Sequence, residues 1–597
     1  INVMSNKLFT TIPVPRFPSN TFSLSRAVMF APRLQKLYAP NVIEILPGDG
    51  INERSEQFAR TQPMVTPVFT KMNAFQEAFF VPNWQLNEHF DDFITGGEDG
   101  MYQDKMPWTT VSNIYRIVLA CLNQAPTTSA AAYNIYIEKI QSIIEHIDLM
   151  RAIPIVLPDF QQATTATVST VATANTNAFT TLNSHLSGVT LRVNLLPFAA
   201  YLKIWCEYYR DENLCEDEFE KYWKGVFPGQ SVSFYSQTGF VDIAQGMQFS
   251  SDYVNCLNAA YALFGAHNRA WKKDYFTSAL PFTQKGPDVL LPLSGVFPVD
   301  FSTGSPLSPS GTVESVEIRN NPATDTKASL NAGNAWMPGN EITASVNLQN
   351  QGLGSTIVDV RRAFALEEFY EADGRGGNRY PENTMMQFGV RTPDSRLPRA
   401  QYLGGNSSPV QIAEVVQNSA TVAGQTPQGT LAGKGTSYGN NRLCRSYNTM
   451  HGFILNFYSV RTQAIYEQGI HPMFSRYDRT EYAWPRFAHL GEQPVHVKEL
   501  WVDSTVTEDE TFGYTPRYSE YKSERSSVHG PLKGSLNYWT MSRKFGSKPQ
   551  LSEDFIYNSP RLDAFAVTNK LIAPLIVEID YRVRANRKLP FFGVPMI

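Results

Sequence analysis

Short runs of β-branched and aromatic residues, bounded by proline or glycine, occupy both ends of this chain and constrain its fold. Near the N-terminus, residues 42–46 lead into a Pro-Gly-Asp-Gly turn signal at 47–50, and further runs cover 65–69 and 75–81. Three more runs lie in the last third, at 452–460, 536–541 and 571–583. Such punctuated runs predict an antiparallel β-sandwich or barrel.

The middle of the chain has a different pattern. Isoleucines recur at helical spacing in 133–152, an apolar stripe predicts a second helix within 195–225, and a short helix is expected at 359–372. Residues 162–184 are almost all Ala, Thr, Ser and Asn, and residues 294–357 are polar and rich in Gly and Pro, so both are expected to be loops. Because this is not a βαβ alternation, we expect one β-sandwich whose inter-strand loops have grown.

The composition permits a protein that is buried against its neighbours. Charged residues make up 18% of the chain, against about 25% in a typical soluble domain. A surface with few charges suits contact with other subunits. Five cysteines without a C-x-x-C pair predict free, buried thiols in a reducing compartment. Because no apolar run approaches the ~18 residues of a membrane span, and no signal peptide is evident, we expect a soluble protein made in a cytoplasm, without membrane insertion.

Basic residues gather at the two ends, although the chain as a whole carries a net charge of −4. Residues 1–43 contain five Lys or Arg and no acidic residue, and residues 581–597 contain four and again no acidic residue. Basic arms bind phosphates, because each neutralised phosphate releases counterions. Ordinary solvated charge at the chain ends is the alternative interpretation.

Three near-matches to catalytic or nucleotide-binding motifs lack the context that these motifs need. Residues 435–439 fit G-x-S-x-G around Ser437, but no helical pattern follows to form the strained turn of a nucleophile elbow. The stretch 429–434 is one residue too short for a phosphate loop, and Arg379 replaces the third glycine of a G-x-G-x-x-G pattern. The last two stretches are expected to be turns.

Metal chemistry is not favoured either. The nine histidines never form H-E-x-x-H or a Cys/His cluster at ligand spacing. The acid-rich run at 211–220 lacks the alternating donors and the central glycine of a calcium loop, so a solvated helix face is expected. Calcium at a subunit boundary is the alternative. We therefore predict no catalytic residue, no cofactor-binding residue, no metal ligand and no enzyme activity.

Several short blocks stand in order from about Asn41 to the C-terminus. They include Leu46-Pro-Gly-Asp49, Phe79-Phe-Val-Pro82, Leu196-Pro-Phe-Ala-Ala-Tyr201, Asp274-Tyr-Phe-Thr-Ser-Ala-Leu-Pro281, Tyr402-Leu-Gly-Gly405 and Arg517-Tyr-Ser-Glu-Tyr521. In this order the blocks resemble the major capsid proteins of the Microviridae, especially those of the gokushovirus branch. The resemblance is slight at 121–190, 222–268 and 294–357.

The resemblance implies a mainly β fold, a single eight-stranded antiparallel jelly-roll β-sandwich with large helical and loop insertions between its strands. On this basis we expect an extended basic N-terminal arm at 1–40 and a jelly-roll capsid domain at 41–597. The insertions would lie at about 121–190, 222–268 and 294–357. The last is the candidate for a surface protrusion, and 121–190 is the second candidate.

The resemblance also implies a structural protein that self-assembles into a small T=1 icosahedral shell around a circular single-stranded DNA phage genome. Its partners would be further copies of itself, the packaged DNA, a small basic DNA-binding protein, a minor or pilot protein and a host cell-surface receptor. It would be assembled in the bacterial host cytoplasm and reside in the virion.

Basic side chains of the two chain ends are expected to face that DNA. Phe591 and Phe592 could stack on unpaired bases, although core packing is the commoner use of such residues. The candidate DNA-facing residues are Lys7, Arg16, Arg582, Arg584, Arg587 and Lys588.

Two other classes of protein remain as alternatives. One is a phage spike or carbohydrate-binding jelly-roll module, which would persist as monomers or trimers instead of closed shells. The other is a hydrolase that uses Ser437 as its nucleophile.

Overall fold

The computed structural model describes most of the chain between residues 18 and 592. The chain divides into two compact units, Ile1–Thr283 with Arg379–Ile597 (unit 1) and Gln284–Asn378 (unit 2). The described stretches are 18–34, 36–98, 105–224, 253–287, 357–377, 379–394, 397–418, 428–557, 561–567 and 571–592, with the single residues 101, 289 and 569 and five short strands between 300 and 345.

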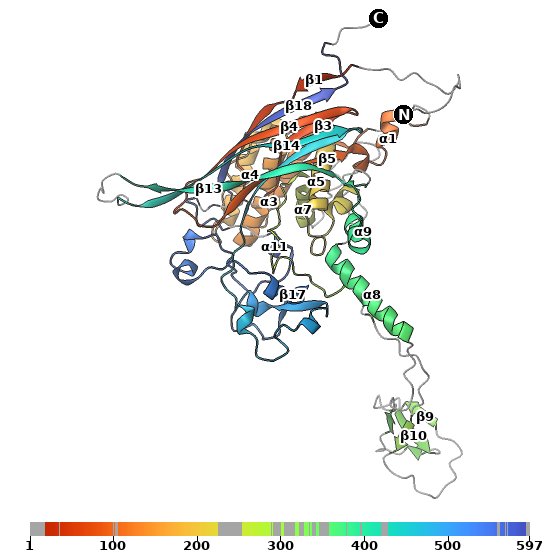
Figure 1. Cartoon of the computed structure of the whole chain (residues 1–597). Helices are drawn as coiled ribbons and strands as arrows, with labels where there is room; N and C mark the ends of the chain where they lie inside the picture. Colours follow the sequence, from red (N-terminus) through yellow and green to blue (C-terminus); the bar gives the residue numbers. More distant parts are fainter. Residues whose placement is uncertain are drawn as a thin grey trace. The chain divides into compact units, whose positions relative to one another are not determined.

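Nine antiparallel strands of unit 1 hydrogen-bond into one sheet (Figure 1). Their order is β1, β18, β4, β14, β13, β5, β15, β3, and β2 also pairs with β18. Strands from the two ends of the chain are therefore neighbours. The bounds are β1 Asn20–Ser23, β2 Arg26–Phe30, β3 Tyr38–Ile45, β4 Asp49–Thr61, β5 Met72–Pro82, β13 Gln401–Val416, β14 Leu431–Asn448, β15 Gly452–Thr462 and β18 Leu575–Arg587.

Strand β13 joins the two halves of this sheet. Its residues 401–410 pair with β5, whereas residues 411–416 pair with β14. The sheet is curled, because buried side chains of β4 and β18 pack in one core with those of β5 and β15. A bulge follows Tyr402. Gly404 in this bulge has a φ of +154°, and a Cβ there would meet the carbonyl oxygen of Leu443 at 2.5 Å, so glycine is required.

The two layers differ in what covers their outer faces. Buried and exposed residues alternate along β4 and β18, so the outer face of that layer is exposed. Strand β15 is buried along almost its whole length. Ile454 and Tyr458 face the core between the layers, whereas Leu455 and Phe457 belong to a second core that includes helical residues. The outer face of the β5–β15 layer is therefore covered by helices.

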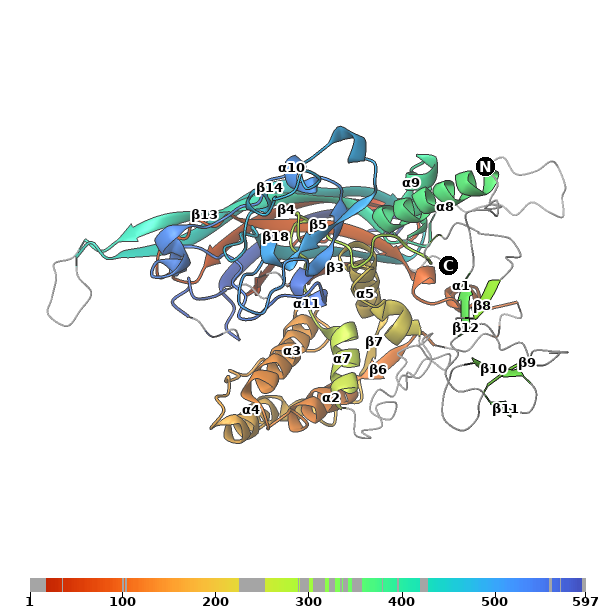
Figure 2. The ribbon, with the colours of Figure 1, turned by 90° about the horizontal axis from the view of Figure 1, so that it is seen from below.

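Helix α5 (Leu196–Tyr208) lies directly on β5 and β15. Its Tyr201 ring stacks on Phe457 with centroids 5.3 Å apart, and its hydroxyl donates a 2.8 Å hydrogen bond to the carbonyl of Leu37. Further helices lie with it on one side of the sheet (Figure 2). They are α2 Val111–Asn123, α3 Ala130–Leu149, α4 Val168–Asn183 and α7 Tyr253–Phe264.

Shorter elements complete unit 1. They are α1 Phe90–Thr95, α9 Tyr380–Phe388, α10 Ser519–Lys522, α11 Glu553–Ile556, the pairs β6 Trp108–Thr110 with β7 Arg192–Asn194 and β16 Glu492–His496 with β17 Thr511–Pro516, a π-helix at Phe219–Lys224, and 3-10 helices at Asn83–Gln85, Ser184–Leu186, Pro472–Phe474, Pro485–Phe487, Val497–Glu499, Gly530–Lys533 and Asn537–Trp539.

Unit 2 contains two small antiparallel sheets and one helix in its described part. One sheet has the order β11, β10, β9, and the other pairs β12 with β8. The bounds are β8 Asp300–Thr303, β9 Glu317–Asn320, β10 Ala328–Ala332, β11 Ala335–Trp336, β12 Ile342–Ser345 and α8 Ile357–Gly376.

The expected mainly β fold with helical insertions is confirmed at the level of a curled antiparallel sheet. The strands expected at 42–46, 75–81 and 452–460 are present as β3, β5 and β15, and the run at 571–583 begins later, as β18. The run at 65–69, also expected as a strand, is not one. Helices expected at 133–152 and 359–372 correspond to α3 and α8. The helix expected within 195–225 is α5, which ends at Tyr208, and a π-helix follows it.

Two further local predictions are wrong. The expected loop at 162–184 contains helix α4, because Phe179 is fully buried against Tyr115 and Asn175 hydrogen-bonds to Gln161 and Tyr133. A polar composition therefore does not indicate a loop here, because the polar side chain of Asn175 forms buried hydrogen bonds within the folded chain. The expected strand at 536–541 is instead a 3-10 turn at Asn537–Trp539, closed by the Thr540 N–H on the carbonyl of Asn537.

The described part of the expected arm at 1–40 is not a free segment. Strands β1 and β2 within it are hydrogen-bonded to β18. Residues 1–17, with Lys7 and Arg16, lie outside the described residues. Of the expected insertions, 121–190 contains α3 and α4, and 222–268 contains α7, whereas most of 294–357 lies outside the described residues.

Replacing Phe457 by Ala tests the junction between helices and sheet. Phe457 is 1% exposed and packs against both Tyr201 and Phe79. We expect Phe457→Ala to lower the free energy of unfolding by about 3–5 kcal/mol, measured by denaturant unfolding of the purified chain. Tyr447→Ala, at an exposed position of β14, should change it by no more than about 0.5 kcal/mol. Equal losses of stability in the two variants would contradict the assigned core.

Candidate nucleic-acid interface

The outer face of the β18–β4–β14 layer carries a row of arginines. The register makes Arg54 on β4 the direct neighbour of Arg582 on β18 and of Arg442 on β14. All three side chains are exposed. Because directly opposed residues of antiparallel strands have Cβ atoms about 5 Å apart, three arginine side chains leave the sheet side by side from three strands.

A second row lies beside the first. A bulge after Arg442 brings Arg445 opposite Asn52, and Asn52 is also the partner of Arg584. Arg445 and Arg584 are exposed as well. Five exposed arginines thus occupy two adjacent rows of one flat surface. This surface, called the arginine face below, consists of Arg54, Arg442, Arg445, Arg582 and Arg584.

Few carboxylates neutralise this charge. Arg582 bonds to Asp580 at 3.0 Å and to Glu56 at 2.7 Å, in the neighbouring row. The hydrogen bond that Arg582 donates to Asp580, with the negative charge of Glu56, raises the pKa of Arg582. The other four arginines form no ion pair with any described residue. Opposed like charges destabilise a sheet, so this surface is suited to an anionic partner.

Tyrosines flank the arginine face. Tyr447 lies opposite Gly50, one row beyond Arg445, and is 69% exposed. Tyr438 is 60% exposed on the other side, where its hydroxyl donates to Glu56 at 2.9 Å. Cationic side chains that meet phosphates, next to aromatic rings on which bases stack, are the usual components of a surface for single-stranded nucleic acid.

The residues expected to face DNA have different roles in the structure. Arg582 and Arg584 belong to the arginine face, and Lys588 is exposed beyond the end of β18. Arg587 is instead only 17% exposed, because it pairs with Asp49 at 3.0 Å and donates to the carbonyl of Glu44. Its guanidinium therefore joins β18 to the β3–β4 turn.

The aromatic pair at the C-terminal end is exposed. Phe591 and Phe592 are 64% and 75% exposed, and Phe591 stacks on Phe22 with centroids 6.0 Å apart. The expectation that these two rings pack in the core is therefore wrong. Strand β18 ends at Arg587, before the two phenylalanines, and the chain has left the core at that point.

Sequence reasoning missed Arg54, Arg442 and Arg445. The alternation Asn52-x-Arg54 along β4 is visible in the sequence, but it does not say which strands lie beside it. Strand β14 is rich in glycine and asparagine and gives no strand signal of its own. Only the pairing of segments far apart in the sequence brings the five arginines together.

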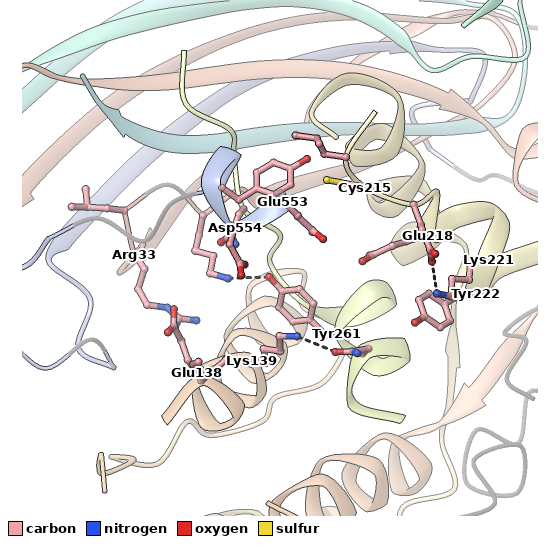
Figure 3. A pocket seen from close by; sticks show the side chains of 18 of the residues that line it. Arg33, Glu138, Lys139, Cys215, Glu218, Lys221, Tyr222, Tyr261, Glu553 and Asp554 are labelled. Atoms are coloured by element: carbon pink, nitrogen blue, oxygen red, sulfur yellow. Dashed lines mark hydrogen bonds and ion pairs between the residues drawn. The ribbon is translucent and has the colours of Figure 1, made fainter. Parts of the chain in front are cut away.

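A cavity of about 680 Å³ lies among α3, α7, α11 and the segment around Glu218 (Figure 3). Several of its charged groups have a bonded partner, as Lys221 has in Glu216. Arg33 pairs with Glu145 at 3.0 Å, outside the labelled wall, and Lys36 donates to the Tyr261 hydroxyl at 2.9 Å. Burial and the nearby Arg33 lower the pKa of Lys36 to about 7.

The cysteine in the wall of this cavity is poorly suited to act as a nucleophile. Burial, with Glu553, raises the pKa of the Cys215 thiol to about 12, so the thiol stays protonated and unreactive. The expected solvated helix face at 211–220 is only partly solvated, because Cys215 and Phe219 are buried. In the described part of the chain, no group of three or more His, Cys, Asp or Glu side chains could hold a metal ion.

Glu218 makes folding depend on pH. Burial, reinforced by Glu553, raises its pKa to about 8, above the ordinary 4.5. Between pH 4.5 and 8 the unfolded chain therefore ionises this group more readily than the folded chain, and stability falls as pH rises.

We expect Glu218→Gln to raise the melting temperature clearly at pH 8.5 and little at pH 4.5, measured by thermal denaturation of the purified chain. The matched control is Glu578→Gln, an exposed carboxylate on β18, which should produce no such pH-dependent gain. A gain for Glu218→Gln that is equal at both pH values would contradict the raised pKa.

The structure also bears on the expectations for Ser437, for the cysteines and for membrane spans. Ser437 lies in the middle of β14 at 1% exposure, with Gln57 as its hydrogen-bond partner at 3.5 Å, and not at a strand-to-helix turn. Four of the five cysteines are described as free and buried, as expected. Among the described residues, no helix is long and apolar enough to cross a membrane.

Comparison with known proteins gives a consistent result. Residues 156–597 match the family described as capsid protein (F protein). The chain is 27% identical to capsid protein VP1 of Chlamydia phage 1, over 100% of this chain and 98% of that protein. It is 28% identical to capsid protein VP1 of Bdellovibrio phage phiMH2K, over 98% and 97%. It is 29% identical to capsid protein VP1 of Spiroplasma virus 4, over 68% and 73%.

These matches confirm the expected resemblance to microvirus capsid proteins and give no support to a spike or carbohydrate-binding module. They point to a structural role, in line with the position of Ser437 inside a strand and away from any nucleophile elbow. The chain belongs to the capsid protein (F protein) family, as a structural protein of the phage virion that assembles with further copies of itself.

Proposed function

We propose that this chain is the repeating subunit of a small T=1 icosahedral shell that encloses a circular single-stranded DNA genome, with the arginine face turned toward the DNA. The scaffold would be a single eight-stranded jelly roll. In support, β13 pairs with both layers and the core between them draws on β4, β5, β15 and β18. Two facing antiparallel layers joined in this way are what a jelly roll requires.

The arginine face is the observation that carries this proposal. The Arg442–Arg54–Arg582 row places like-charged residues side by side, and bound phosphates would relieve their mutual repulsion. Tyr447 and Tyr438 add ring faces at the border of the same surface. Stacking on such rings does not depend on base sequence, as a protein that packages a whole genome needs.

Further partners follow from the charge balance and from the family. The net charge of −4 leaves most genome phosphates unneutralised, which favours a separate small basic DNA-binding protein. A minor or pilot protein and a host cell-surface receptor would complete the virion's contacts, and assembly would take place in the bacterial host cytoplasm. The candidate for a surface protrusion remains residues 294–357.

Removing two arginines of the first row tests whether this face binds DNA. We expect Arg54→Gln with Arg442→Gln to reduce the DNA packaged per particle, measured from the ratio of nucleic acid to protein absorbance. In single-stranded DNA binding by the purified chain, the log–log slope against salt should fall by about 0.7 for each phosphate that is no longer neutralised.

The matched control combines Arg116→Gln with Arg486→Gln, two exposed arginines outside the sheet. This control changes net charge equally and should leave packaging and the salt slope unchanged. Equal effects of both double variants, or normal packaging in the first, would contradict the assignment of the arginine face.

Assembly is tested by negative-stain electron microscopy of the purified protein. We expect uniform closed shells, because a subunit with several complementary surfaces closes under point-group symmetry. Persistent monomers or trimers at all concentrations would contradict the shell and would favour a spike or carbohydrate-binding module.

A further inference from the structure

A second cavity, of about 690 Å³, lies against the outer face of the β5–β15 layer, whereas the arginine face belongs to the other layer. Glu77 and Phe79 of β5, which point away from the core between the layers, form part of its wall. The rest comes from the end of α5 and the residues just after it, from residues 269–273, from eight residues between 381 and 402, and from Arg461 of β15. Its aromatic residues are Phe79, Tyr208, Tyr209, Trp271 and Tyr402.

The wall contains seven cationic side chains and four carboxylates, and each carboxylate already has a partner. Glu77 pairs with Arg269 at 2.8 Å, and Asp211 pairs with Lys273. The last two carboxylates are also bound: Glu382 pairs with Arg379 at 3.2 Å, and Asp394 accepts from the Tyr208 hydroxyl at 3.3 Å. The carboxylates therefore leave an excess of positive charge.

Four cations in this wall form no ion pair with any described residue: Lys272, Arg391, Arg399 and Arg461. Arg461 is half-buried over the Phe75 ring, 4.8 Å from its centroid. Burial and the neighbouring Arg269 lower its pKa to about 10, which shows that its surroundings stabilise its charge poorly. Cations of this kind favour an anionic ligand.

Two buried donors in the same wall also lack acceptors. Trp271 is 3% exposed, and its indole N–H has no hydrogen-bond partner among the described residues. The Nε of Arg399 has none either, although this guanidinium lies 4.2 Å from the centroid of the Tyr208 ring. Because an unsatisfied buried donor is costly, such groups usually mark a site where a ligand or water completes the bonding.

We propose that this cavity binds a phosphate monoester joined to a ring, as in a nucleoside monophosphate or a sugar phosphate. A phosphate monoester offers several acceptor oxygens and up to two negative charges to a wall whose unpaired groups are donors and cations. Inorganic phosphate alone would leave most of 690 Å³ unfilled. Tyr402, 48% exposed and packed on Phe79 at 5.3 Å, offers a face for the ring.

Calorimetric titration of the full chain at about 0.15 M salt, where weak surface binding of anions is screened, tests this proposal. The probes are thymidine monophosphate, glucose 1-phosphate, inorganic phosphate, thymidine and glucose. We expect one phosphorylated ring compound to bind with a stoichiometry of one per chain, more tightly than inorganic phosphate, and its unphosphorylated counterpart to bind at least about tenfold more weakly.

Either phosphorylated compound as the tighter ligand supports the proposal and identifies the source of the phosphate. Equal binding of a phosphorylated compound and its uncharged counterpart overturns it, and so does the absence of binding by both phosphorylated compounds.

Variants locate the site. Arg461→Gln should weaken binding by about tenfold or more, and Trp271→Phe, which keeps a ring but removes the N–H, by about threefold. Arg116→Gln, an equal change of charge at an exposed position outside this cavity, should have no effect. If Arg461→Gln lowers the melting temperature, the exposed Arg391→Gln provides the same test. Unchanged affinity in a folded Arg461 or Arg391 variant, or an equal loss of affinity in Arg116→Gln, would overturn the proposal.

Discussion

Strand β15 is buried on both faces, and the two cores of unit 1 meet at this strand. Ile454 and Tyr458 point into the core between the two layers, while Leu455 and Phe457 point into the core shared with the helices. A slip of one residue would exchange these two sets of side chains, so the register is strongly fixed. The pairing of β15 with β5, of β5 with β13 and of β13 with β14 extends this fixed register to the arginine rows.

The elements that the sequence predicts well are those whose own side chains carry the signal. The isoleucine spacing of α3 and the apolar runs of β5 and β15 need no knowledge of their neighbours. Strand β14 is different, because two of its glycines are explained only by their neighbours in space. A Cβ atom at Gly433 would clash with Thr66, and one at Gly439 would clash with Ser408, and both neighbours belong to other segments of the chain. Glu53 is another case: it is surrounded by polar residues in the sequence, yet it is fully buried.

The candidate site was predictable in kind but not in composition. Charge asymmetry at the C-terminus pointed to Arg582 and Arg584, which lie on the arginine face, and also to Arg587, which pairs with Asp49. The other three arginines of the face come from β4 and β14, and only sheet register brings them beside β18. The distribution of charge along the sequence reveals the basic C-terminal end. It does not reveal the arginine face, because that surface combines residues from three strands that are far apart in the sequence.

The two sides of unit 1 are suited to different tasks. One layer presents a flat basic surface, and the other is covered by helices and has cavities between them. A shell subunit needs this division, because its inner surface meets a genome of variable sequence and its outer surface meets other partners. The most direct test is a cryo-EM reconstruction of assembled particles at side-chain detail. Our account predicts that Arg54, Arg442 and Arg582 line the inner surface with nucleic-acid density against them. An arginine face on the outer surface, or one covered by a neighbouring subunit, would contradict it.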